Sequence, residues 1–103
     1  MEIKIIWKLH RRAKYGGAHT AEENALKGLP RSLRGEAARA LERLIRLRLV
    51  LVKPTGYGRH VSLNRDAVAF LHGVCDWYEV HHAEVQDEDV YPFPEPVDGP
   101  GRG

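Results

Sequence analysis

Residues 30–63 constrain the fold most strongly, because an amphipathic helix there leads directly into a tight hairpin. At about 100° per residue, one helical face is apolar and centred on Leu41, and the opposite face is basic. The apolar face comprises Ala37, Ala38, Leu41, Leu44 and Ile45, and the basic face comprises Arg39, Arg43 and Arg46. Two short β-branched and apolar runs around the turn at residues 55–58 then predict a β-hairpin.

Two further helices are expected before this stretch. Thr20 and Glu23 have the spacing of a capping box, which predicts a short helix over about residues 21–27, ended by Gly28 and Pro30. Residues 1–14 alternate in part as a strand does, but their Leu, Lys, Arg and Ala content favours a helix. Helix, helix, turn, helix and hairpin together predict a winged helix-turn-helix, in which the hairpin is the wing.

The predicted fold class is therefore α+β and mainly α, with the winged helix-turn-helix over residues 1–64. A long C-terminal helix over residues 65–85 follows, with Asn64 as its expected cap, and then an acidic tail rich in proline and glycine over residues 86–103. The apolar stripe of the long helix comprises Val68, Leu71, Val74, Cys75 and Tyr78. This face is broad for one small domain, so we expect a homodimer.

The charge is unevenly distributed along the 103 residues. Residues 1–65 hold 15 Lys and Arg against 5 Asp and Glu, whereas residues 66–103 hold 1 against 9. A basic region of this density suits a polyanion, and double-stranded DNA is the partner that the predicted architecture favours.

The candidate DNA contacts lie on the third helix and the wing. From the helix they are Arg31, Ser32, Arg34, Arg39, Arg43 and Arg46, with those at its N-terminal end nearest the bases and the last two nearest the backbone. From the wing they are Lys53, Tyr57, Arg59 and His60, with Arg59 a candidate for the minor groove. The alternative is a solvated face, because Glu36–Arg39 and Glu42–Arg46 have the spacing of intrahelical ion pairs.

The sequence gives little support for catalysis, cofactor binding or metal binding. We expect no catalytic residues and no cofactor, since no nucleophile with a partner and no phosphate-binding glycine loop is recognisable. The set His72, Cys75, His81 and His82 matches no familiar zinc-site spacing, so no metal is expected. With a single cysteine, no signal peptide and no long apolar run, the expected location is the cytoplasm, without a membrane partner.

A resemblance adds to this interpretation. The chain resembles a group of small archaeal winged-helix proteins that share a Gly-Gly-His-Thr-like turn, a Leu-Pro helix end, an Arg-Gly-Glu helix, a Lys-Pro-Thr-x-Tyr-Gly wing and a closing Ser-Leu-Asn. The matching segments are residues 17–20, 29–30, 34–36, 53–58 and 62–64. In many of those proteins glycine is expected where the helix meets the wing, at the position that Leu47 or Arg48 holds in this chain. The resemblance implies an archaeal source, a winged-helix fold and DNA binding.

We therefore predict a DNA-binding transcriptional regulator. The alternative is a winged-helix module that binds another protein within a larger assembly, since fold alone does not fix function. RNA binding is a third hypothesis, and the lack of an aromatic stacking platform counts against it.

Overall fold

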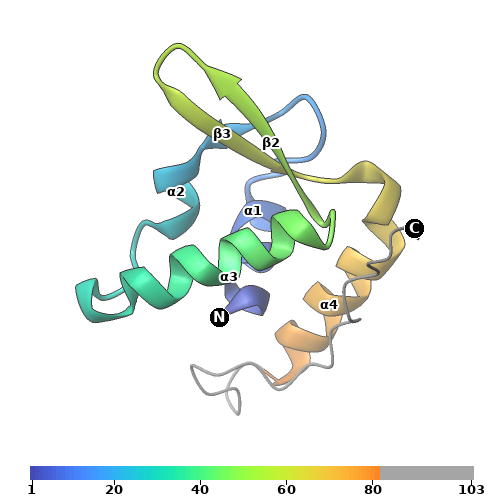
Figure 1. The fold of residues 1–103 in the computed structure, drawn as a ribbon. Coiled ribbons are helices and arrows are strands. Elements are labelled where there is room, and N and C mark those ends of the chain that lie inside the picture. Colours follow the sequence, from blue (N-terminus) through green and yellow to red (C-terminus); the bar gives the residue numbers. More distant parts are fainter. Residues whose placement is uncertain (82–103) are drawn as a thin grey trace.

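The computed structural model describes residues 1–81, which fold into four α-helices and one small antiparallel sheet (Figure 1). Single turns of 3-10 helix at Arg31–Leu33 and Arg65–Ala67 precede the third and fourth helices. The elements in chain order are α1 (Glu2–Arg11), β1 (Thr20–Ala21), α2 (Glu22–Leu26), α3 (Arg34–Arg46), β2 (Val50–Thr55), β3 (Gly58–Leu63) and α4 (Val68–His81). The expected α+β, mainly helical class is confirmed, and the predicted tail at 86–103 lies outside the described residues.

The predicted hairpin is confirmed, and it is the main part of the sheet. Strands β2 and β3 pair antiparallel, with Val52 opposite Val61 and Lys53 opposite His60. At the turn, the Thr55 hydroxyl accepts a hydrogen bond of 3.1 Å from the Tyr57 backbone N–H. Figure 1 shows the hairpin projecting beyond the helices from the end of α3.

A short third strand was not expected. β1 pairs with β3 through Thr20 opposite Val61, which gives the sheet order β1–β3–β2. The predicted capping box is therefore wrong, because Thr20 is part of the sheet and α2 begins only at Glu22. The Thr20 hydroxyl instead accepts a hydrogen bond of 3.0 Å from the Asn24 side chain.

The hydrophobic core lies between α1, α3, α4 and the inner face of the sheet. α1 packs against both α3 and α4, and it buries apolar side chains on more than one side. The largest fully buried side chains include Ile3, Ile5, Ile6, Leu9, Leu41, Leu44, Val50, Val61, Leu63, Leu71 and Val74. A helix at residues 2–11 is thus confirmed, and the helices and hairpin share one core.

The inward face of α3 is turned slightly from the predicted one. Ala37, Leu41 and Leu44 are buried as expected, but Ala40 is buried in place of Ala38, which is exposed. Both side chains are small and only weakly hydrophobic, so the sequence does not fix which of the two alanines faces the core. The outer face of α3 therefore includes Ala38 together with Arg39.

α3 ends without glycine. Arg48 adopts the left-handed conformation with φ 65°. Its N–H bonds to Ile45 O at 3.0 Å, and the Leu49 N–H bonds to Leu44 O at 3.0 Å. These two bonds form a Schellman motif, which ends the helix and turns the chain into β2.

The start of the last helical segment agrees with the sequence. Asn64 Oδ1 accepts a hydrogen bond of 2.9 Å from the Asp66 backbone N–H, which confirms Asn64 as a cap. On α4, Leu71, Val74 and Cys75 are buried, whereas Val68 is 40 % exposed and falls outside the buried stripe. Within residues 1–81, no helix is both long and apolar enough to cross a membrane.

Candidate nucleic-acid interface

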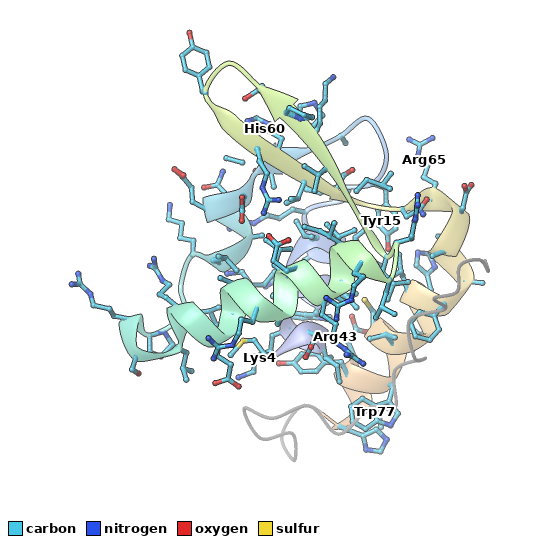
Figure 2. The ribbon with its side chains drawn as sticks, in the orientation of Figure 1. Lys4, Tyr15, Arg43, His60, Arg65 and Trp77 are labelled. Atoms are coloured by element: carbon cyan, nitrogen blue, oxygen red, sulfur yellow. The ribbon has the colours of Figure 1, made fainter. Side chains whose placement is uncertain are left out.

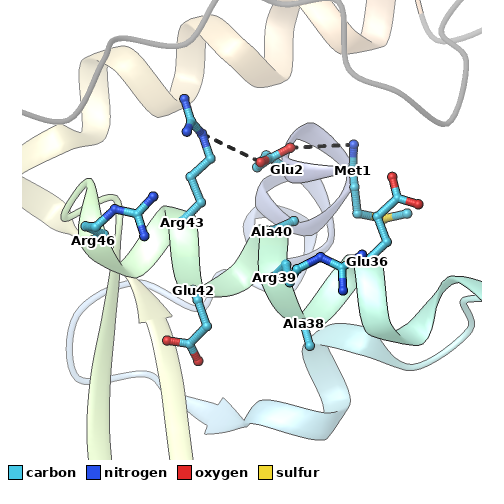
Figure 3. A pocket seen from close by; sticks show the side chains of 9 residues that line it. All are labelled: Met1, Glu2, Glu36, Ala38, Arg39, Ala40, Glu42, Arg43 and Arg46. Carbon is cyan, nitrogen blue, oxygen red and sulfur yellow. Dashed lines mark ion pairs between the residues drawn. The ribbon is translucent and has the colours of Figure 1, made fainter.

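The outer surface of α3 borders a broad hollow of about 700 Å³ beside the start of α1 (Figure 3). Arg39 and Arg46 lie seven residues apart, so their side chains leave the helix within about 20° of each other. Both are exposed, and neither forms an ion pair in the described part of the chain. The residues lining the hollow are Met1, Glu2, Glu36, Ala38, Arg39, Ala40, Glu42, Arg43 and Arg46.

Arg43 differs from these two arginines. It is half-buried, and its Nε lies 3.7 Å from Glu2 Oε2, so its guanidinium reaches across to the first turn of α1 (Figure 3). Glu2 also lies 3.8 Å from the amino terminus. Arg43 thus links α3 to α1, which reduces the charge that it presents to a ligand.

The N-terminal end of α3 presents three predicted contacts on different sides. Arg31 and Ser32 are exposed in the 3-10 turn, and Ser32 does not cap α3, because Leu33 occupies the N-cap position. Arg34 is the first residue of α3, and about 140° separates it from Arg39 around the helix. Arg34 therefore lies away from the Arg39–Arg46 side.

The four predicted wing contacts do not form one cluster. Successive side chains of a strand point to opposite faces, so Arg59 and His60 diverge. Lys53 lies directly opposite His60 and shares its face of the sheet. Tyr57 is fully exposed at the turn. Figure 2 shows His60 along the hairpin, on a different element from Arg43.

Arg59 is paired with carboxylates of two helices. Its Nε and Nη2 donate hydrogen bonds of 2.9 Å each to the two carboxylate oxygens of Glu22, and Nη2 also contacts Glu42 at 2.5 Å. The hydrogen bond from Arg59 lowers the pKa of Glu22. The guanidinium thus joins β3 to α2 and α3, and these contacts argue against the expected entry of Arg59 into a minor groove.

The same contact removes one of the ion pairs considered for α3. Glu42 turns to Arg59 instead of Arg46, and Glu36 makes no ion pair with Arg39 among the described residues. The two outer arginines of α3 therefore keep their charges available. This arrangement argues against the alternative of a self-neutralised, solvated face.

A histidine pair on the outer face of the sheet was missed by sequence reasoning. His19 Nδ1 lies 2.8 Å from His60 Nδ1, so one ring nitrogen donates and the other accepts. Partial burial lowers the pKa of His19, and Lys53, His60 and Lys14 lower it further. Because 41 residues separate the two histidines, no local sequence signal points to their contact.

The candidate metal ligands of α4 face different neighbours. His72 packs edge-on against His10, with 5.2 Å between the ring centroids. His81 lies against Trp77, with 4.8 Å between the ring centroids. Burial raises the pKa of the Cys75 thiol to about 12. Within residues 1–81, no three His, Cys, Asp or Glu side chains are grouped to hold a metal ion; His82 lies outside the described residues.

Comparison with known proteins gave no matching family model, no matching curated protein and no matching solved structure.

Proposed function

We propose that this chain is a winged helix-turn-helix protein that binds double-stranded DNA and acts as a transcriptional regulator. The order of the elements supports the proposal. α2 and α3 are joined by residues 27–33, which include the 3-10 turn Arg31–Leu33, and β2 and β3 follow α3 as a hairpin. The sheet order β1–β3–β2 joins this hairpin to the helical body, as a wing requires.

The observation that carries the proposal is the pair of outer arginines on α3. Arg39 and Arg46 are exposed, project from the same side of the helix and lack a carboxylate partner within residues 1–81. Guanidinium groups suit both phosphates and the O6/N7 edge of guanine. A helix that presents two of them outward is suited to a major groove.

The proposed mechanism is binding without chemistry. Arg39 lies in the N-terminal half of α3 and reads a base edge, while Arg46 and Arg31 contact phosphates on either side. Lys53 and the exposed Tyr57 of the hairpin contact the adjacent backbone. Arg59 holds the hairpin against α2 and α3, and thereby sets the angle between wing and helix.

A salt series of fluorescence anisotropy measurements on random duplex DNA tests the proposal. The variants are Arg39→Gln and Arg46→Gln, singly and combined, with Arg65→Gln as a control. Arg65 is exposed at the start of the α4 segment, so the control removes one surface charge outside α3 and the hairpin. The slope of log K against log salt is negative, and each lost phosphate contact reduces its magnitude by about 0.9.

The expected result is tight, salt-dependent binding by the wild type that collapses in the double variant and persists in the control. Equal losses in the control and the single variants would mean that only net charge matters. Absence of binding even at low salt would favour the second candidate, a winged-helix module that docks on another protein. A homodimer would give two such surfaces, with half-sites about one helical turn apart.

A further inference from the structure

A second basic surface lies where the end of α1 meets the turn between α2 and α3. It is formed by Lys8, Arg11, Arg12, Lys27 and Arg34, and is called the Lys8 surface below. The Lys8 ammonium donates a hydrogen bond to the Lys27 backbone carbonyl at the end of α2. Lys8, Arg11 and Arg12 line a hollow of about 270 Å³.

No carboxylate neutralises this surface within the described part of the chain. None of its five cations forms an ion pair there. Burial lowers the pKa of Lys8, and the charges of Arg12, Arg34 and Lys27 lower it further. The native fold therefore brings like charges together, at a cost in stability.

Ordinary structural roles account for only part of the surface. Arg11 and Arg12 at the end of α1 complement the helix dipole, and Arg11 also stacks over the Trp7 ring at 4.7 Å. Arg34, however, begins α3, where the helix dipole disfavours a cation. Its charge adds to the repulsion around Lys8 and has no compensating contact in residues 1–81.

We propose that the Lys8 surface contacts the phosphate backbone of double-stranded DNA beside the N-terminal end of α3. This inference rests on the proposed function and extends the DNA contact to Lys8, Arg12 and Lys27. Several cations spread over three elements suit a row of phosphates better than a single small anion. Arg34 places the Lys8 surface next to the N-terminal end of α3, because it is the first residue of α3 and its charge acts on Lys8.

The test compares two double variants by the salt dependence of duplex binding and by thermal unfolding. Arg12→Gln/Lys27→Gln removes two exposed charges from the surface and keeps the backbone carbonyl that Lys8 uses. Arg48→Gln/Arg65→Gln removes two exposed charges that lie beyond the C-terminal end of α3. About 20 Å of helix separates Arg34 from that end.

We expect Arg12→Gln/Lys27→Gln to bind duplex about tenfold more weakly than the wild type. The magnitude of its slope of log K against log salt should fall by between about 1 and 2. Its melting temperature should be unchanged or higher. The control pair should keep the wild-type slope. A lower melting temperature with unchanged affinity would overturn the inference and assign these cations to the fold. Unchanged affinity and slope would overturn it as well.

Parallel measurements on Arg39→Gln/Arg46→Gln separate this inference from the proposed function. If that variant loses binding while Arg12→Gln/Lys27→Gln does not, the Lys8 surface is excluded and α3 is retained. If the wild type binds no duplex at low salt, both fail. If polyglutamate displaces DNA from the wild type but not from Arg12→Gln/Lys27→Gln, the surface prefers an acidic polypeptide, which overturns the DNA assignment.

Discussion

Arg59 of β3 binds Glu22 at the start of α2 through two parallel hydrogen bonds of 2.9 Å. The bidentate geometry needs the planar guanidinium fork, which lysine lacks. Arg59 also contacts Glu42, so a single side chain fixes the hairpin relative to both α2 and α3. This contact sets the position of the hairpin next to α3.

We expect Arg59→Gln to lower the free energy of unfolding by about 1 kcal/mol, since the pair is partly screened by solvent. The side chains of Arg59, Glu22 and Glu42 remain 38 %, 29 % and 53 % exposed. Urea unfolding measures the loss, and Arg59→Lys should restore only part of it. Because the folded pKa of Glu22 is lowered, its contribution is present above its unfolded pKa and disappears as the pH falls through the folded value. If Arg59→Gln lowered the free energy of unfolding by the same amount at pH 2 as at neutral pH, the ion pair with Glu22 would not be the cause.

Arg48→Gly should raise the free energy of unfolding by about 1 kcal/mol, because Arg48 has φ 65° and glycine adopts this conformation without a Cβ penalty. Arg46→Gly, two residues earlier within α3, should lower it by a similar amount. Paired urea titrations at neutral pH give both values. Equal effects of the same sign at the two positions would be incompatible with a left-handed helix end at Arg48.

Acidification should weaken the contact between His19 and His60. Because the folded pKa of His19 is lowered, the unfolded chain binds more protons below about pH 6.5, and stability falls as the pH decreases through that region. Thermal unfolding between pH 5 and pH 8 should show this dependence in the wild type and less of it in His19→Gln. His72→Gln on α4 serves as the control and should keep it. An identical pH profile in His19→Gln would argue against a coupled pair.

Cys75 should resist thiol reagents in the native state. Its side chain is 1 % exposed, and burial raises the pKa of the thiol to about 12, so little thiolate is available at pH 8. Labelling with an aromatic disulfide reagent should be slow in buffer and fast in denaturant. Rapid labelling under native conditions would show that α4 opens readily from the core.

The parts of the fold that local patterns specify were predictable. The hairpin and the Asn64 cap follow from patterns within a few residues. The helix at residues 2–11 follows from its content of helix-forming residues, because its spacing also fits a strand in part. β1 was not, because a two-residue strand exists only through its pairing of Thr20 with Val61. The turn of α3 toward Ala40 was also missed, since alanines give a weak hydrophobic signal.

The candidate interface was predictable at the level of residue type and only partly at the level of geometry. The outward position of Arg39 and Arg46 follows from helical periodicity. Arg59 lies 37 positions from Glu22 and 17 positions from Glu42, so no local pattern in the sequence indicates that its guanidinium is ion-paired. Sequence spacing also placed Lys53, Arg59 and His60 together, but strand alternation puts Arg59 on the opposite face from Lys53 and His60.

The most direct test of DNA binding through α3 is an NMR titration of the full chain with a short duplex at low salt. Amide signals should shift along α3 around Arg39 and Arg46 and at the hairpin turn around Tyr57, while those of Leu71 and Val74 in α4 stay in place. Shifts confined to α4, or no shift at any duplex concentration, would contradict the account.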